Sequence, residues 1–427
     1  MSSVGTPFRI AVPDSQLDLL QKKLSLATFP DELENSGWRY GAPLADVERL
    51  VARWREGYDW KAEEAKLNEE LPQFTRDIEV SGGHGKMNIH YVYKRSEVEN
   101  AIPLLFVHGW PGSFIEVRKI LPLLIQAFPD GKFPSFHVVA FSLPGYGFSE
   151  APTKPGFIVE HYAEIGNKLM LALGYNEYVT QGGDWGAIIT RKIAQIYGGK
   201  NSKAWHTNVA LAAPPTLTSQ PLLYLRQLFR PFTAAEKAAF ERTLWFQKEG
   251  MGYFLEQSTQ PQTVGYSLAD SPVGLLAWIY EKLVTWTDSY PWEDDEVLTW
   301  VSIYYFSRAG PTAAARTYYE VFHSPDAFGS PSALKSKPTI PMGVSVFPKE
   351  LVFTPKSWIS ASGNLVYVNE HTSGGHFAAH EKPELLVGDL RKMLGRKGPV
   401  YGIVPGKNGY VPRTRSRRDK RKGGAKL

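Results

Sequence analysis

The chain of 427 residues contains no cysteine, and this absence excludes several kinds of site at once. Disulfide scaffolds, thiolate zinc fingers, iron–sulfur clusters and cysteine nucleophiles all need that side chain. The composition therefore permits a reducing, intracellular compartment. The sequence also lacks an apolar run approaching the ~18–20 residues of a membrane span, and its first residues carry no basic segment followed by an apolar one. We expect a soluble, unprocessed protein without a membrane partner.

Positive charge is concentrated at one end of the chain. The net charge is +5, but from Arg413 onward eight Lys or Arg residues accompany a single acidic residue, Asp419. The rest of the chain is therefore slightly acidic, which argues against a nucleic-acid partner. The last residues, Ala425-Lys426-Leu427, resemble the Ser-Lys-Leu address read by the peroxisomal import receptor, so peroxisome and cytoplasm are both open. A solubilising tail and a nuclear-type basic run are the other interpretations.

The order of apolar patterns indicates an α/β fold with accessory segments. Short apolar runs alternate with helical patterns, which predicts a mostly parallel sheet covered on both faces. Expected strands are 87–93, 102–107, 136–143, 178–181, 342–347 and 365–368. Expected helices are 14–26, 43–58, 114–127, 161–173, 185–197, 234–247, 272–286 and 383–394. We divide the chain into an N-terminal meander (1–90), a first core part (91–213), a helical cap (214–325), a second core part (326–396) and a basic, flexible tail (397–427).

The segment Gly182-Gly-Asp-Trp-Gly186 lies where an apolar strand runs directly into a helix. This is the small–x–nucleophile–x–small layout of a nucleophile elbow, a sharp turn that exposes one side chain. The start of the helix places positive partial charge beside Asp184. A carboxylate nucleophile suits displacement at a saturated carbon, because the ester that forms can then be hydrolysed. An ordinary turn capped by Asp184 is the alternative for this segment taken alone.

A second motif follows the first strongly apolar strand, and its residues are His108, Gly109, Trp110 and Pro111. In a fold with a nucleophile elbow, this loop supplies one backbone N–H group of the oxyanion hole. The expected donors are the amides of Trp110 and of Trp185, which comes directly after the nucleophile.

His376, in Gly-Gly-His-Phe, lies between the last expected strand and the last expected helix, where a general base would reach the elbow. Such a histidine needs an acid on its other nitrogen. Glu350 follows a strand-like run and precedes His376, which gives the chain order nucleophile, acid, histidine of α/β-hydrolases. The competitors for the acid are Asp294, Asp295 and Glu370.

His380 comes four residues after His376, so a metal pair is a rival interpretation of this segment. The sequence offers no obvious third ligand beside these two histidines. We therefore expect no metal at these histidines.

Taken together, the motifs resemble the microsomal-type epoxide hydrolases, especially their soluble fungal members, and they are also similar to the insect juvenile-hormone enzymes. The resemblance extends from about Pro7 to Leu394 and includes Pro144-Gly-Tyr-Gly-Phe-Ser149. It implies an α/β-hydrolase fold with a helical cap insertion and the epoxide hydrolase N-terminal region.

The resemblance also implies two cap tyrosines that bind and protonate the epoxide oxygen. Tyr253, in Gly-Tyr-Phe, and Tyr318, in Thr-Tyr-Tyr-Glu, match their motifs, with Tyr266 and Tyr319 as local alternatives. The implied reaction forms a hydroxyalkyl ester on Asp184. Water activated by His376 then releases a vicinal diol, and this reaction requires no metal and no organic cofactor.

Two other reactions stay open at the sequence level. Haloalkane dehalogenases share the aspartate nucleophile and the tryptophan after it, and an epoxide-opening cyclase of secondary metabolism would use an internal hydroxyl in place of water. A serine hydrolase is excluded because the chain has no Gly-x-Ser-x-Gly elbow. A non-catalytic relative would be expected to lose Asp184 or His376. The 22 Phe, 12 Trp and 21 Tyr residues favour a small apolar epoxide as substrate, and the oligomeric state is open, a homodimer included.

Overall fold

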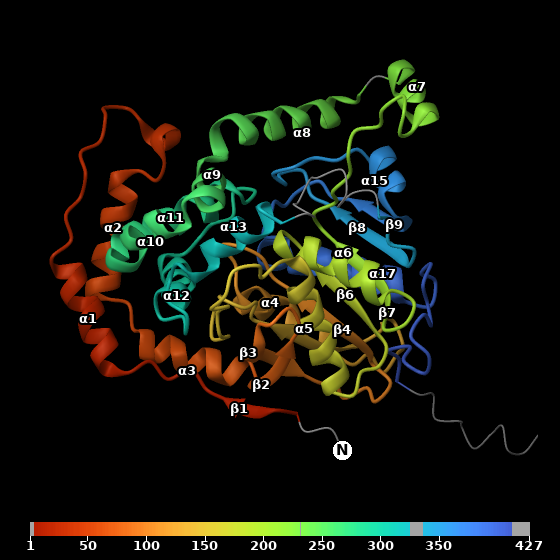
Figure 1. The fold of residues 1–427 in the computed structure, drawn as a ribbon, viewed down its shortest axis with the longest axis horizontal. Helices are drawn as coiled ribbons and strands as arrows, with labels where there is room; N and C mark the ends of the chain where they lie inside the picture. Colours follow the sequence, from red (N-terminus) through yellow and green to blue (C-terminus); the bar gives the residue numbers. More distant parts are fainter. Residues whose placement is uncertain (1–3, 231, 325–335, 412–427) are drawn as a thin grey trace, which may run out of the picture.

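The computed structural model describes residues 4–230, 232–324 and 336–411, and in this part of the chain nine strands form one sheet (Figure 1). The strand order is β1-β2-β3-β5-β4-β6-β7-β8-β9. Pairs from β1 to β3 and between β3 and β5 are antiparallel, whereas all later pairs are parallel. This confirms the predicted α/β class. The strands are β1 (Thr6–Phe8), β2 (Gln73–Val80), β3 (Gly85–Lys94), β4 (Ile102–Val107), β5 (Phe136–Phe141), β6 (Tyr178–Gly182), β7 (Ser202–Thr207), β8 (Pro341–Val346) and β9 (Asn364–Glu370).

The centre of the sheet is covered on both faces. Every residue of β4 and β5 is buried, and since successive side chains point to opposite faces, both faces must be packed. Helix α5 packs on α6, and α4 packs on α16 and α17. The core helices are α4 (Val117–Ile125), α5 (Val159–Ala172), α6 (Trp185–Tyr197), α15 (Lys356–Ser362), α16 (Ala378–Glu381) and α17 (Pro383–Leu394).

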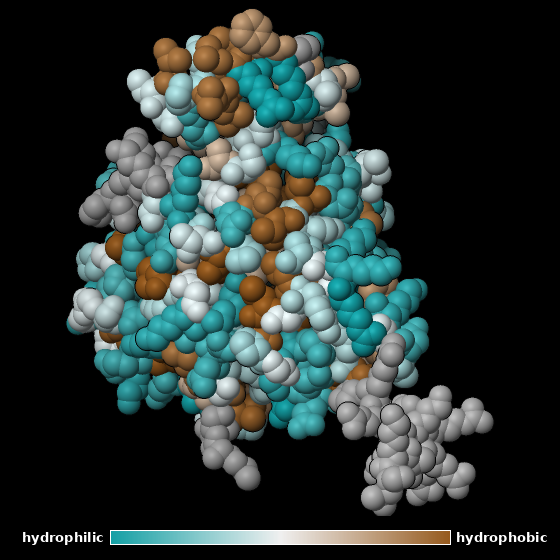
Figure 2. Space-filling model, turned by 90° about the vertical axis from the view of Figure 1, so that its right-hand side faces the viewer, coloured by the Kyte–Doolittle hydropathy of each residue, from teal (hydrophilic) through white to brown (hydrophobic). Residues whose placement is uncertain are grey.

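A helical cap lies between β7 and β8 in the sequence, within the segment 214–325 expected for it. Its helices are α7 (Pro221–Phe229), α8 (Ala234–Trp245), α9 (Gly252–Thr259), α10 (Pro261–Asp270), α11 (Pro272–Thr285), α12 (Asp294–Tyr305) and α13 (Arg316–Phe322). Figure 1 shows α8 running across the top of the cap and α7 projecting beyond it. Apolar side chains gather over α7 (Figure 2), where Leu222, Leu228 and Phe229 are 82%, 63% and 84% exposed.

The N-terminal meander runs along the outer side of the cap (Figure 1). Its helices are α1 (Asp14–Ser25), α2 (Leu44–Glu56) and α3 (Trp60–Glu70). Helix α2 contacts α11 and α12, and α3 contacts α12. The chain then joins the core sheet through β2 and β3. The boundary expected at residue 90 therefore falls inside β3, and meander and core share one sheet.

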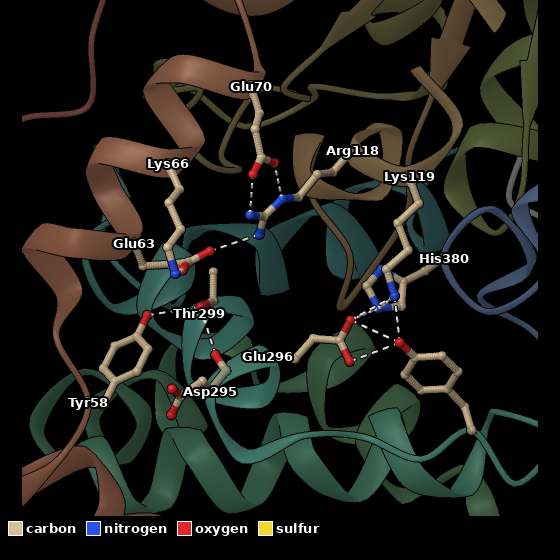
Figure 3. Close-up of polar contacts among 11 residues, drawn as sticks. Tyr58, Glu63, Lys66, Glu70, Arg118, Lys119, Asp295, Glu296, Thr299 and His380 are labelled. Atoms are coloured by element: carbon tan, nitrogen blue, oxygen red, sulfur yellow. Dashed lines mark hydrogen bonds and ion pairs between the residues drawn. The ribbon is translucent and has the colours of Figure 1, made fainter. Parts of the chain in front are cut away.

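Meander, core and cap meet at the start of α4 (Figure 3). The Arg118 guanidinium donates to Glu63 at 2.8 Å and to Glu70 at 2.9 Å, both on α3. The next residue, Lys119, lies 2.7 Å from a carboxylate oxygen of Glu296 on α12. Because two neighbouring residues of one helix bind both accessory segments, the positions of meander and cap are coupled to α4.

The segment after α17 corrects one expectation from the sequence. Residues 397–411 were expected to form part of a flexible tail, but Val400, Val404 and Tyr410 are no more than 4% exposed. The Gly409 N–H group donates to the Asn100 carbonyl at 2.9 Å, which ties this segment to the core. The Ala425-Lys426-Leu427 motif lies outside the described residues.

None of the helices within the described ranges combines the length and apolar character that crossing a lipid bilayer requires.

Candidate active site

The backbone of Asp184 turns sharply between β6 and α6. β6 ends at Gly182, α6 begins at Trp185, and Asp184 has φ 50° and ψ −127°, a conformation that is strained for a residue with a side chain. Gly186 makes the turn possible, because a Cβ atom there would lie 1.9 Å from the Val107 carbonyl oxygen. The local geometry is that of a nucleophile elbow.

The loop after β4 brings one expected oxyanion donor to this elbow. The Trp110 N–H group donates to Asp184 Oδ1 at 2.8 Å. Trp185 is the first residue of α6, so its N–H group is among those that a helix leaves without an intrahelical partner. His108 supports the neighbouring loop, because its Nε2 atom accepts a hydrogen bond from the Leu143 N–H group at 3.1 Å. Burial lowers the pKa of the His108 imidazole to about 4.

Loops after β8 and β9 place Glu350 and His376 beside each other. The Nδ1 atom of His376 lies 2.6 Å from Glu350 Oε1, which also accepts the Leu351 N–H group at 2.7 Å. On the other side of the ring, Nε2 lies 3.5 Å from Asp184 Oδ2. The structure therefore brings together the three residues in which the sequence analysis placed nucleophile, acid and base.

Charge determines the protonation of His376. Burial lowers the pKa of this imidazole, but the carboxylates of Glu350 and Asp184 raise it by more, so the pKa stands well above its usual value. In the enzyme without substrate, these two acidic side chains therefore favour the protonated form of His376.

Two cap tyrosines cover the oxyanion loop and the elbow. The ring of Tyr253, on α9, stacks on Trp110 at 4.9 Å, and the ring of Tyr318, on α13, meets Trp185 edge-on at the same distance. The two tyrosine rings lie 5.9 Å apart. Burial raises the pKa of both phenols well above the usual value, so both keep the proton that a donor needs. The local alternatives lie at the surface, with exposed fractions of 70% for Tyr266 and 38% for Tyr319.

The cap also holds the oxyanion loop directly. The indole N–H of Trp300 donates to the Pro111 carbonyl at 2.5 Å, and the Tyr304 hydroxyl donates to the Gly112 carbonyl at 2.7 Å. Both donors lie on α12. The loop that carries Trp110 is thus fixed by the cap as well as by the sheet.

The histidine loop is fixed by the segment after α11. The His376 N–H group donates to the Trp286 carbonyl at 2.9 Å, and the Gly374 N–H group donates to Asp288 Oδ2 at 2.8 Å. The Trp286 ring also meets the His376 ring edge-on at 5.1 Å. Both catalytic loops therefore depend on the cap for their position.

The residues weighed as alternatives have partners elsewhere. The Nε2 atom of His380 lies 2.8 Å from Glu296 Oε1 (Figure 3), and Glu370 is exposed at the end of β9. The two cap aspartates pair with arginines of α2, Asp294 with Arg49 and Asp295 with Arg53. Across the described ranges, no group of three or more His, Asp and Glu side chains is arranged to hold a metal ion.

Glu116 is a site residue that the sequence analysis missed. It lies at the end of a short 3-10 helix, Phe114–Glu116, and it lines a small cavity together with Asp184 and His376. In the sequence it is simply an acidic residue at the start of a helix, where such residues are common. Its only local signal is Gly112, four residues earlier, whose missing side chain leaves room for the carboxyl group.

Comparisons with known proteins agree over most of the chain. Residues 5–117 match the family model of the epoxide hydrolase N terminus, and residues 102–291 match that of the alpha/beta hydrolase fold. Epoxide hydrolase 1 of Sus scrofa is 35% identical over 412 residues, which cover 91% of this chain and 88% of that protein.

Two solved structures are also similar. The epoxide hydrolase of Aspergillus niger is 35% identical with a TM-score of 0.77, covering 91% of this chain and 95% of that one. The juvenile hormone epoxide hydrolase of the silkworm Bombyx mori is 31% identical with a TM-score of 0.81, covering 90% and 92%. The chain belongs to the epoxide hydrolases, within the α/β-hydrolase fold.

Proposed function

We propose that this enzyme converts an epoxide and water to a vicinal diol through a covalent ester on Asp184. The proposal rests mainly on the position of Asp184, which lies at the elbow between an oxyanion donor, Trp110, and a histidine–glutamate pair. Since Trp110 binds Oδ1, the Oδ2 atom is the one available to attack a ring carbon. The aromatic rings of Tyr253 and Tyr318 above the elbow favour a small apolar substrate.

In the first half-reaction, Asp184 Oδ2 attacks a ring carbon from the side opposite the C–O bond, which breaks. Tyr253 and Tyr318 bind the epoxide oxygen, and one of them gives it a proton. Water at neutral pH is a poor proton source for this oxygen, whereas a positioned acid contributes about 10²–10⁴-fold to the rate. The product of this step is a hydroxyalkyl ester and a tyrosinate.

Ester formation removes the negative charge of Asp184, and this prepares the second half-reaction. One of the two charges that raise the pKa of His376 is lost, so the imidazolium becomes more acidic and releases its proton. That proton returns to the tyrosinate, which becomes a neutral phenol again. His376 is then neutral and can act as a base.

In the second half-reaction, His376 takes a proton from water while the water oxygen bonds to the ester carbon of Asp184. The amides of Trp110 and Trp185 hold the oxyanion, an interaction worth about 3 kcal/mol per donor in comparable sites. The carbon–oxygen bond to the diol breaks, the diol oxygen takes up the proton that the added water oxygen still carries, and the carboxylate returns with one oxygen from water.

The test uses that oxygen. We expect multiple turnovers of styrene oxide in heavy-oxygen water to label the peptide that contains Asp184, and we expect Asp184→Ala to be inactive. Mass spectrometry of the digested protein measures the label. Diol formation without label in Asp184 would mean direct attack by water and would overturn the assignment. Turnover of a haloalkane, with no epoxide of a broad panel reacting, would favour the dehalogenase alternative.

A further inference from the structure

One lysine of the cap is buried beside Tyr253. Lys282, on α11, is 5% exposed, although a lysine is rarely buried unless a partner stabilises its charge. Its Nζ atom lies over two aromatic rings, 4.7 Å from the centre of the Trp278 ring and 5.5 Å from that of the Tyr253 ring. An ammonium group within about 6 Å of a ring centre is attracted to the ring, and more strongly where water is excluded. Lys282 therefore brings a positive charge against the ring of Tyr253.

The ion-pair partner of this lysine is its neighbour in the sequence. Lys282 pairs with Glu281, and the side chains of the two residues are 7% and 28% exposed. Burial lowers the pKa of the Lys282 ammonium, and the Glu281 carboxylate opposes that fall. The carboxylate is thus the more exposed end of the pair, and it supports the charged form of the lysine. The ammonium is the end that lies among the aromatic rings.

The first half-reaction needs a positive charge in the cap. When Asp184 becomes an ester and a tyrosine gives up its proton, the negative charge of the carboxylate ends on a phenolate. Burial raises the pKa of Tyr253, the Asp184 and Glu281 carboxylates add to the rise, and the cation of Lys282 acts in the opposite direction. Ester formation removes the contribution of Asp184, but the phenolate stays buried. A cation at its ring is then the charge that favours its formation.

The two cap tyrosines differ in this respect. Aromatic rings surround Tyr318, with those of Trp185 and Phe254 at 4.9 and 5.5 Å. In the described ranges, no Lys or Arg side chain lies over the Tyr318 ring. Burial raises the pKa of both phenols, but the interaction with Tyr318 lowers the pKa of Tyr253, whereas Tyr253 raises that of Tyr318. The surroundings therefore favour the anion on Tyr253.

We propose that Tyr253 is the tyrosine that gives its proton to the epoxide oxygen, and that Lys282 is a positioning residue that stabilises the resulting phenolate. As Asp184 Oδ2 bonds to the ring carbon, the carbon–oxygen bond breaks and leaves its electron pair on the oxygen, which takes the Tyr253 proton. The electron pair of the O–H bond stays on Tyr253. Lys282 exchanges no proton, and Tyr318 contributes a hydrogen bond. The inference rests on the proposed ester mechanism and concerns only the first half-reaction.

The first experiment compares neutral and cationic replacements of the lysine. Single-turnover mixing with styrene oxide, followed by tryptophan fluorescence and by mass of the quenched protein, gives the rates of ester formation and ester hydrolysis. For Lys282→Met and Lys282→Gln we expect ester formation slowed about tenfold and ester hydrolysis within about twofold of the wild type. Lys282→Arg keeps the cation and should form the ester within about threefold of the wild-type rate.

The second experiment asks whether the lysine acts through Tyr253. Effects of two residues that act on one another are not additive, so each tyrosine is replaced together with the lysine. In a Tyr253→Phe background, Lys282→Met should cause no further slowing of ester formation, because the phenolate that the lysine stabilises cannot form. In a Tyr318→Phe background, the same substitution should still slow ester formation about tenfold.

Lys248→Met is the matched control, because Lys248 is a cap lysine that also pairs with a sequence neighbour, Glu249, but its side chain is 82% exposed. Both rates should stay unchanged in it. Equal slowing of the two half-reactions, equal slowing in the Met and Arg variants, or a full further loss in the Tyr253→Phe background would overturn the role of Lys282. If the wild-type protein forms no ester, the proposed function itself fails, which is a different result.

Discussion

The Nδ1 atom of His376 lies 2.6 Å from Glu350 Oε1, and the charge of this glutamate acts on the histidine throughout the reaction. In the proposed mechanism, the charge of Asp184 acts only until the ester forms. One carboxylate therefore orients the ring permanently, whereas the other changes its basicity between the two half-reactions. This difference leads to the first two predictions.

Replacing Asp184 with Asn should lower the pKa of His376. Burial then opposes the imidazolium while only Glu350 supports it, so the imidazole becomes neutral at a lower pH than in the wild type. The variant imitates the charge state of the ester. NMR titration of the His376 ring measures the shift, and an unchanged pKa in Asp184→Asn would contradict the charge argument.

Glu350→Gln should slow ester hydrolysis by about 10²–10⁴-fold, because the amide still offers an acceptor to His376 Nδ1 but removes the charge that supports its imidazolium. Ester formation depends less on this pair, so the ester should accumulate in rapid-quench experiments. Glu370→Gln is the control, since Glu370 is exposed at the end of β9. A variant that hydrolyses its ester at the wild-type rate would exclude Glu350 as the orienting acid.

Tyr253→Phe and Tyr318→Phe should each slow ester formation, because the leaving oxygen loses a donor whose contribution is about 10²–10⁴-fold for proton transfer. Hydrolysis of any ester that forms should change less. Stopped-flow measurement of ester formation tests this, with Tyr266→Phe as the control because that ring is 70% exposed on α10 of the same cap. Equal rates in the Phe variants and the wild type would remove both tyrosines from the mechanism.

The free energy of unfolding of Glu116→Gln should increase, relative to that of the wild type, as the pH rises. The pKa of this carboxyl is raised from 4.5 to about 8, so between these values the folded protein retains a proton that the unfolded chain has lost. Stability of the wild type therefore falls with rising pH in this window, whereas glutamine does not titrate. We expect the difference in free energy of unfolding to grow by about 2 kcal/mol from pH 5 to pH 7. Urea unfolding at both pH values measures it, and a constant difference would show that Glu116 is ionised.

Arg118→Ala should lower the free energy of unfolding by about 1–2 kcal/mol, because its side chain is 25% exposed and joins two glutamates of α3 to the core. The loss should shrink at high salt, which screens charges at such partly exposed positions. Arg55→Ala provides the comparison, since among the described residues Arg55 pairs only with the neighbouring Glu56, at an exposed place. Losses of equal size in the two variants would argue against a bridging role for Arg118.

Elements whose ends carry a glycine or proline signal were predicted well from the sequence. The expected strand 102–107 and the expected helices 185–197 and 383–394 match β4, α6 and α17 residue for residue. β7 was missed because Ser-Lys-Ala-Trp-His-Thr contains no apolar run, and its place in the sheet comes from pairing with the parallel strands on either side. Tertiary pairing, which a local pattern does not contain, determines such a strand.

The site residues also differ in whether a local sequence pattern or a tertiary contact determines their place. Asp184, His376 and Trp110 lie in short motifs at strand ends, so local patterns indicated them. Glu116 acquires its place from a missing side chain four residues away, and a single glycine does not by itself indicate a site residue. The packed segment 397–411 was likewise hidden, because contacts such as the hydrogen bond from Gly409 N–H to the Asn100 carbonyl join residues that lie far apart in the sequence.

The hydrogen bonds from α12 to the oxyanion loop limit how substrate can enter. If the cap swung away as one rigid lid, Trp300 would leave the Pro111 carbonyl and Tyr304 would leave the Gly112 carbonyl, and the loop that aims the Trp110 amide would lose its supports. The coupling of α12 to Lys119 resists the same movement. We therefore expect epoxide and diol to pass through local displacements of other cap helices, so that the oxyanion donor stays aligned between one turnover and the next.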